Sequence, residues 1–111
     1  MAGKFEIYKD KAGEFRFRLK AGNGQNILAS EGYKKKPSAL NGIESVKKNV
    51  ADPKRIVSTE TAGGKWRFVV TSTNGQTVGT SQSYADERGC KKGIASVVNT
   101  APDARTDDQT V

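Results

Sequence analysis

Residues 13–50 read GEFRFRLKAGNGQNILASEGYKKKPSALNGIESVKKNV, and residues 64–101 read GKWRFVVTSTNGQTVGTSQSYADERGCKKGIASVVNTA. A shift of 51 residues aligns the two stretches without a gap, with identical residues at 12 of 38 positions. The identities gather at turn residues and apolar positions, which chance does not explain. Two copies are too few for a solenoid, in which each repeat stacks on the next. The sequence therefore predicts one domain with pseudo-twofold symmetry.

Each copy contains strands joined by tight turns. Phe15–Lys20 alternates apolar and charged residues, as a strand with one buried face does, and Trp66–Thr71 keeps the apolar positions. An Asn-Gly dipeptide follows each of these strands, and it favours a two-residue hairpin turn with positive φ at both residues. We therefore expect one such hairpin in each copy. The other predicted strands are 26–31 and 77–82, which close the hairpins, and 5–9 and about 55–60, which precede them.

From Pro37 the apolar residues recur at three and four, which marks one face of a helix. Pro37 suits the first helical position, where its missing N–H costs nothing. The second copy repeats the apolar stripe and carries Asp86 and Glu87 at the N-terminal end, where negative charge is favourable. Gly42 and Gly93 lie at matching mid-helix positions, each at a cost of roughly 0.5–1 kcal/mol relative to Ala. We therefore expect the helix backbone to approach the sheet closely there.

These patterns predict an α+β domain in which two tandem β-β-β-α repeats share one mainly antiparallel sheet of about six strands. Two helices cover one face, and a pseudo-twofold axis relates the halves. The domain is expected to span residues 1–101, with repeats at about 4–51 and 52–101. Residues 102–111 lack apolar periodicity and are expected to form a disordered tail. The apolar strand residues expected under the helices are Phe15, Phe17, Leu19, Trp66, Phe68 and Val70.

The runs GEFRFRLK, NGQ, SEGY and SALNGIESVKKN of the first copy resemble the YegP-like family of small bacterial proteins with one or two such repeats. The second copy matches more loosely, and the resemblance covers roughly residues 4–101. It implies units that share a single sheet and exchange their terminal strands. The family has no assigned activity, so no catalytic or binding residue is carried over. The copies differ where KKKP at 34–37 becomes ADER at 85–88, which argues against a function that needs two basic helix entries.

The residue counts limit the chemistry. The chain has no histidine and one cysteine, Cys90. It therefore lacks the commonest general base and metal ligand, and it can form no internal disulfide, which fits a reducing compartment. We expect a non-enzymatic protein without catalytic residues, cofactor or metal. No apolar run approaches the ~18 residues of a membrane span, so we also expect a cytoplasmic monomer without membrane association.

The net charge of +7 favours an anionic partner. Strand alternation directs several cations to the sheet face opposite the helices, with Tyr8 nearby, and such a face resembles platforms that bind single-stranded nucleic acid. A lysine run precedes the first helix, whose N-terminus is a place where phosphates bind. The predicted nucleic-acid-binding residues are Arg16, Arg18, Lys20, Arg67, Lys34, Lys35 and Lys36. The alternative is a solvated face whose cations pair across strands, for example Arg16 with Glu6 or Glu31.

A second hypothesis is a protein-interaction or assembly module that uses exposed sheet edges to pair with a partner or with itself. Salt dependence separates the two hypotheses, because phosphate contacts release counterions and edge pairing does not. Cys90 lies on the apolar helix face and is expected to be a buried small side chain rather than a reactive thiol.

Overall fold

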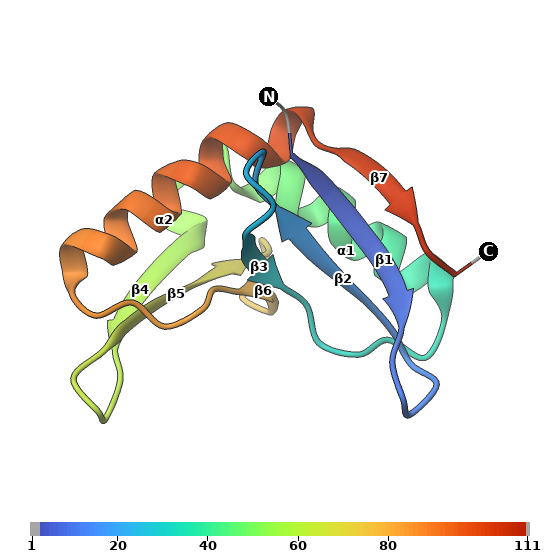
Figure 1. The fold of residues 1–111 in the computed structure, drawn as a ribbon, viewed down its shortest axis with the longest axis horizontal. Coiled ribbons are helices and arrows are strands. Elements are labelled where there is room, and N and C mark those ends of the chain that lie inside the picture. The colour runs from blue at the N-terminus through green and yellow to red at the C-terminus, as the bar shows by residue number, and fades with distance from the viewer. Residues whose placement is uncertain (1–2, 111) are drawn as a thin grey trace.

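The computed structural model describes residues 3–110 and places two helices on one face of a seven-stranded sheet (Figure 1). This arrangement confirms the predicted fold class. Along the chain the elements are β1 (Lys4–Lys9), β2 (Phe15–Lys20), β3 (Asn26–Ala29), α1 (Lys36–Asn49), β4 (Ile56–Glu60), β5 (Trp66–Thr71), β6 (Thr77–Thr80), α2 (Glu87–Thr100) and β7 (Arg105–Asp108). A short 3-10 helix follows each α-helix, η1 (Pro53–Arg55) after α1 and η2 (Ala101–Asp103) after α2.

The strands lie in the order β4-β5-β6-β3-β2-β1-β7, and each neighbouring pair is antiparallel except β1 with β7. The two copies meet at the centre, where Ala29 of β3 faces Thr80 of β6. The pseudo-twofold axis therefore passes between these two strands. In Figure 1 the sheet bends into an arch, with α2 above β4 and β5, α1 behind β1 and β2, and the β1–β2 and β4–β5 turns at its two lower ends.

The seventh strand, β7, lies in the segment 102–111 that was expected to be a disordered tail. That expectation was wrong, because η2 and β7 order this segment up to Thr110, while Val111 lies outside the described residues. β7 adds to β1 in parallel, and the Gln109 N–H just after it donates to the Ile7 carbonyl at 2.8 Å. Its sequence shows no apolar alternation because it is an edge strand, which backbone pairing and ion pairs hold in place instead of burial.

The Asn-Gly dipeptides do close hairpins, but with a different turn from the one predicted. Among residues 3–110 only glycines have positive φ, so Asn23 does not adopt the left-handed conformation. The Gly24 N–H donates to the Ala21 carbonyl at 2.9 Å, and the Ala21 N–H donates to the Gln25 carbonyl at 2.9 Å. The loop therefore has three residues and ends on Gly24 with φ 87°, the usual alternative to a two-residue hairpin. The other three hairpin turns contain the same left-handed glycine.

The hydrophobic core lies between the helices and the sheet. Four of the six strand residues predicted to face the helices are fully buried, namely Phe17, Leu19, Phe68 and Val70. The other two, Phe15 and Trp66, begin their strands and are half-buried. The helices contribute Ala39, Ile43, Val46, Cys90 and Val97, all of which are buried.

Both mid-helix glycines are places of close approach, as predicted, and the neighbour is a tyrosine. A Cβ on Gly93 would overlap the Tyr84 hydroxyl, and a Cβ on Gly42 would lie 2.8 Å from the Tyr33 hydroxyl oxygen. Each tyrosine ring stacks on a core phenylalanine, with ring centroids 6.4 Å apart for Tyr33 and 6.3 Å apart for Tyr84. A tyrosine therefore wedges between helix and sheet in each copy, which explains why both residue types recur.

Candidate functional site

The open face of the sheet, on the side away from the helices, carries the predicted strand cations. Arg16, Arg18 and Lys20 point to this face from β2, and their side chains are 38%, 30% and 29% exposed. Arg67 lies on the same face of β5 and is exposed. The alternation of β2 and β5 was therefore predicted correctly.

The structure does not bring Arg16 and Arg67 together, although they are repeat mates. β3 and β6 lie between β2 and β5, so three inter-strand spacings, about 14 Å, separate the two strands. β2 and β5 run in opposite directions, and each arginine lies near the start of its own strand. The two arginines therefore lie at opposite ends of the sheet and cannot contact one small ligand.

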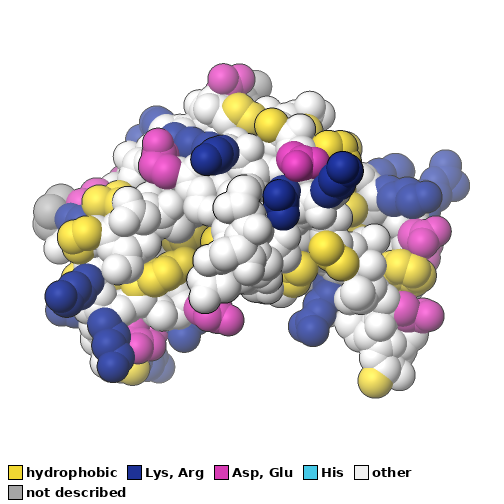
Figure 2. All heavy atoms as spheres, turned by 180° about the vertical axis from the view of Figure 1, so that it is seen from behind, with side chains coloured by type: hydrophobic (Ala, Val, Ile, Leu, Met, Phe, Trp, Pro, Cys, Tyr) yellow, Lys and Arg dark blue, Asp and Glu magenta, His cyan; other side chains and the backbone are white. Residues whose placement is uncertain are grey.

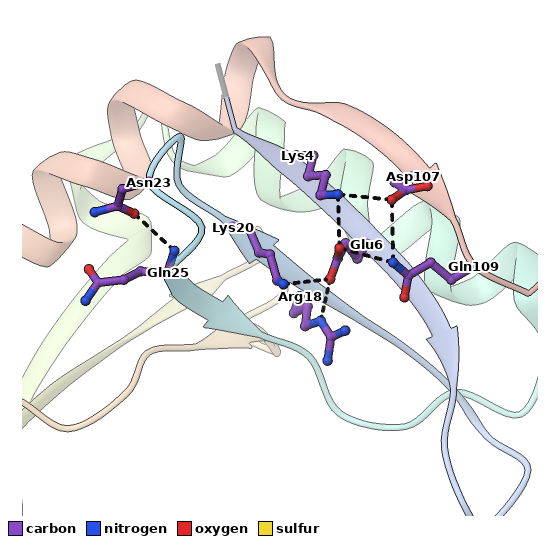
Figure 3. Close-up of polar contacts among 8 residues, drawn as sticks. All are labelled: Lys4, Glu6, Arg18, Lys20, Asn23, Gln25, Asp107 and Gln109. Atoms are coloured by element: carbon purple, nitrogen blue, oxygen red, sulfur yellow. Dashed lines mark hydrogen bonds and ion pairs between the residues drawn. The ribbon is translucent and has the colours of Figure 1, made fainter. Parts of the chain in front are cut away.

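Arg18 and Lys20 surround a buried carboxylate, that of Glu6 on β1 (Figure 3). Arg18 Nε lies 2.7 Å and Lys20 Nζ 3.5 Å from Glu6 Oε1, and Lys4 Nζ lies 3.2 Å from Oε2. Gln109 Nε2 donates to Oε2 at 3.1 Å. The Glu6 side chain is only 4% exposed. This cluster joins β1, β2 and the C-terminal segment through polar contacts.

The surrounding cations favour the ionised form of the Glu6 carboxylate. Burial raises its pKa, but hydrogen bonds from Arg18 and Lys4 and the charges of Arg18 and Lys20 outweigh burial and lower the pKa to about 2. The positive charge of β2 is therefore matched by a negative charge within the same face. Sequence reasoning named Glu6 as a cross-strand partner of Arg16, but the register of β1 against β2 places Glu6 opposite Arg18 instead.

Arg16 is also paired. Its Nε lies 2.7 Å from Asp10 Oδ2, and the hydrogen bond from Arg16 lowers the pKa of Asp10. The Arg18 guanidinium lies 4.5 Å from the centroid of the Tyr8 ring, a cation–π contact on the open face. The expected pairing of cations across the sheet is thus present, although the partner of Arg16 is Asp10 rather than Glu6 or Glu31.

The lysine run divides at the start of α1. Lys36 is the first residue of the helix, and its ammonium pairs with Asp108 at the end of β7. The hydrogen bond from Lys36 lowers the pKa of Asp108 to about 2. Lys34 and Lys35 are exposed. Within residues 3–110, Lys34, Lys35 and Arg67 make no ion pair.

On the open face, carboxylates thus pair with the three β2 cations of the first copy, and Arg67 is the predicted strand cation of the second copy. In the second copy Val57 replaces Glu6 and Val69 replaces Arg18, and these two valines face each other across β4 and β5. Figure 2 shows the molecule from behind the view of Figure 1, and there Lys and Arg side chains are scattered among Asp and Glu side chains. Arg67 lies apart from Arg16, Arg18 and Lys20, because β3 and β6 separate β5 from β2.

The outer edge of β4 differs from the equivalent edge of β1. β1 and β4 are repeat mates, and β7 covers the outer edge of β1. No strand within residues 3–110 covers the outer edge of β4. The two otherwise equivalent edges of the duplicated sheet therefore differ in occupancy.

The backbone of β4 points hydrogen-bonding groups outward. Ser58 faces Phe68 across the β4–β5 ladder. The Phe68 N–H donates to Ser81 Oγ at 2.9 Å, and the Phe68 carbonyl accepts from the Ser81 N–H at 2.9 Å. In an antiparallel ladder the N–H and C=O of one residue point to the same side, so Phe68 does not bond Ser58. The Ser58 backbone groups must then point away from β5.

By the same alternation, Ile56 and Glu60 also direct their backbone groups outward. The equivalent groups of β1 are used: Ile7, the repeat mate of Ser58, accepts its hydrogen bond from Gln109 after β7. The outer edge of β4 thus carries the same hydrogen-bonding groups with which β1 binds β7.

Apolar surface flanks this edge on both faces. On the open face Val57 is 44% exposed. On the helix face a groove of about 310 Å³ lies beside β4. Its lining residues are Val50, Ala51, Pro53, Ile56, Ile94 and Val98. Sequence reasoning named exposed edges without saying which, because it missed the strand that covers one of them.

The described residues also differ from what a metal site, a reactive thiol or a membrane-spanning helix requires. Within residues 3–110 no three His, Cys, Asp or Glu side chains are grouped so that they could hold a metal ion. Cys90 is fully buried, as predicted, and burial raises the pKa of its thiol. No helix in this part of the chain has the length and apolar character needed to cross a membrane.

Comparison with known proteins places these features in a family. The domain of unknown function DUF1508 matches twice, over residues 10–56 and 62–108. A UPF0339 protein encoded in the ptx operon 5′ region of Stutzerimonas stutzeri is 61% identical over 105 residues, which are 95% of each chain. The solution NMR structure of YegP from Escherichia coli, a protein of unknown function, has 42% identity and a TM-score of 0.94, and the match covers 99% of this chain and 95% of YegP. That of a UPF0339 protein from Shewanella oneidensis has 38% identity and a TM-score of 0.94, over 99% and 93% of the chains. The chain therefore belongs to the DUF1508 family, as a tandem two-repeat member related to YegP.

Proposed function

We propose that this chain is a protein-binding module in which the outer edge of β4 accepts an extended segment of a partner. The single observation that carries the proposal is the difference between two equivalent edges: β7 lies on β1, whereas no strand of the described residues 3–110 lies on β4. Addition of a strand to an open sheet edge is a common mode of peptide recognition, because main-chain hydrogen bonds supply affinity without requiring one sequence.

The composition of β4 supports this proposal. Native proteins usually protect an edge strand with lysine, proline, a bulge or an inward-pointing charge. Ile56–Thr59 has no charged residue or proline, although Glu60 ends β4 and Arg55 precedes it, and Val57 is the most exposed apolar side chain of the strand. The opposite edge strand β7 reads Arg-Thr-Asp-Asp, whose charges discourage pairing. The edge left open is thus the one best suited to pairing.

The test is a selection from a random peptide display library on the immobilised protein, with Ser58→Pro as the counter-selection. The Ser58 N–H points outward, so proline removes a donor from the edge without removing a hydrogen bond from the β4–β5 ladder. Sequences enriched on the wild type should lose binding to Ser58→Pro and should shift the amide NMR signals of Ile56, Ser58 and Glu60. Enrichment that survives Ser58→Pro, or no enrichment, would contradict the proposal.

Weak binding of nucleic acid or another polyanion is a second candidate, favoured by the net charge of +7 and by the exposed, unpaired Lys34 and Lys35. Arg16, Arg18 and Lys20 contribute less to it than the sequence suggested, because carboxylates already pair with them. The candidate therefore depends on the loop before α1 more than on the sheet.

Its test is the anisotropy of labelled single-stranded and duplex oligonucleotides at about 50 and 200 mM salt, where phosphate contacts weaken steeply. The double variant Lys34→Ala/Lys35→Ala should lower affinity more than Arg16→Ala. Lys91→Ala/Lys92→Ala removes the same charge from α2 and serves as the control. Equal losses in the two double variants would indicate nonspecific charge, and no binding at the lower salt concentration would exclude this candidate.

A further inference from the structure

We infer that the segment bound at β4 runs parallel to β4 and carries two adjacent apolar residues, one over the groove opposite Ile56 and one against Val57. This inference rests on the proposed function and adds the orientation and the chemistry of the ligand. The occupant is an extended segment of another polypeptide.

The orientation follows from the internal symmetry. The pseudo-twofold axis carries β1 onto β4, and it carries β7 onto the vacant place beside β4. β7 pairs in parallel with β1, with Thr106 opposite Phe5 and Asp107 opposite Glu6. A segment that uses the equivalent hydrogen-bonding groups of β4 therefore also runs parallel, and its N-terminal end lies beside Arg55.

The groove supplies the first apolar position. The equivalent place in the first copy is filled by Phe5, the repeat mate of Ile56, which is fully buried. The Lys47 ammonium also lies there, 5.7 Å from the centroid of the Phe5 ring. In the second copy Val98 replaces Lys47. Ile56 and Val98 are smaller than Phe5 and Lys47, so the second copy has an open, uncharged groove of about 310 Å³ at this place.

The residues of the bound segment that lie beside Ile56 and Val57 must differ in chemistry from the β7 residues at the equivalent positions. Successive residues of a strand point to opposite faces, so the ligand residue opposite Ile56 lies over the groove and the next one lies against Val57 on the open face. β7 has Thr106 and Asp107 at these positions, which suit Phe5 and the cations around Glu6. Beside Ile56 and Val57 the matching residues are apolar.

The probe is a synthetic decapeptide, blocked at both ends, with the sequence of residues 101–110 and the substitutions Thr106→Leu and Asp107→Val. Its binding is followed by amide NMR of the ¹⁵N-labelled full chain. A spin label on either peptide end reports orientation. We expect shifts at Ser58 and Glu60, broadening near Arg55 from the N-terminal label, and broadening near Glu60 from the C-terminal label. Restoring Thr106 in the peptide should weaken binding about tenfold, because the leucine side chain then no longer fills the groove.

The protein variant Ile94→Lys places a charge in the groove and should abolish the preference for leucine, while Ser58→Pro should abolish binding of both peptides. Reversed broadening, equal affinity for the two peptides, or shifts at Ile7 from exchange with β7 would overturn this inference. Self-association of the chain that Ser58→Pro abolishes would overturn it as well, since the occupant would be a second copy. In each of these cases the proposed function would still be supported if the display selection yields ligands whose binding is lost in Ser58→Pro. If neither the probe nor any selected sequence binds the β4 edge, both proposals fail.

Discussion

Replacement of Glu6 by Gln tests whether the buried carboxylate holds β1, β2 and the C-terminal segment together. The amide keeps the size of the side chain and removes its charge, so that Lys4, Arg18 and Lys20 lose their shared counter-ion. The substitution therefore separates the electrostatic role of Glu6 from its packing.

The magnitude follows from the pKa of Glu6. Lowering that pKa from 4.5 to about 2 corresponds to about 3 kcal/mol of stabilisation of the folded state when the group is ionised. The three cations are 29–31% exposed, so solvent screens part of this interaction, and we expect a loss of about 2 kcal/mol in Glu6→Gln at pH 7. For a domain of this size that loss lowers Tm by about 8 °C.

The pH dependence gives the sharper test. Because the pKa is lower in the folded state than in the unfolded state, the stabilisation is complete above pH 4.5 and is lost as pH falls toward 2. The difference in unfolding free energy between wild type and Glu6→Gln should therefore shrink over that window. Urea unfolding followed by Trp66 fluorescence measures it at each pH.

Glu44→Gln is the matched control, because Glu44 is 73% exposed and has one ion-pair partner, Lys47, whose Nζ lies 3.6 Å from Glu44 Oε2. Its loss should stay below about 0.5 kcal/mol. A loss in Glu6→Gln that is equally small, or one that persists unchanged at pH 2, would refute the electrostatic account of the cluster.

Three further outcomes follow from the packing. Gly93→Ala should destabilise the fold by about 2 kcal/mol in urea unfolding, because its methyl group meets a tyrosine hydroxyl, whereas Gly63→Ala, with nothing within 4 Å, should change stability by less than about 0.5 kcal/mol. Cys90 should resist a thiol reagent in the native state and react on unfolding, and rapid native labelling would contradict its burial. Asp108→Asn removes the ion pair with Lys36 and should speed amide hydrogen exchange of Gln109, with an unchanged rate showing that backbone pairing alone holds β7.

Local patterns were enough to predict the repeating elements. The alternation of Phe15–Lys20, the period of α1 and the negative charge at the start of α2 depend on residues close in sequence, and the structure has all three. Asp86 accepts the N–H of Gly89 at 2.8 Å, as an N-cap should. The hairpin turn was predicted in place but not in type, because a three-residue loop can also end on the glycine of an Asn-Gly pair.

Contacts between distant segments could not be predicted in the same way. β7 has no apolar alternation, and its order comes from β1, about a hundred residues earlier in the chain. The neutralisation of Arg18 likewise depends on which strand lies next to β2. Once the C-terminal segment was taken as disordered, the two sheet edges looked alike, and the one that remains open could not be identified.

The order of the strands along the chain explains why the edge of β4 is open. It does not explain which residue types lie beside that edge. In each copy the chain that leaves the helix continues into a strand. After α1 this strand is β4 itself, which begins the second copy, and after α2 it is β7, which adds to β1. Duplication alone therefore leaves one edge covered and one edge open. An open edge without a role is expected to carry protective charges. Here the charged pair Glu6 and Arg18 lies in the covered copy, and valines take its place beside the open edge, at 57 and 69. That distribution leaves apolar side chains on the open face beside β4, as the proposed binding of another chain requires.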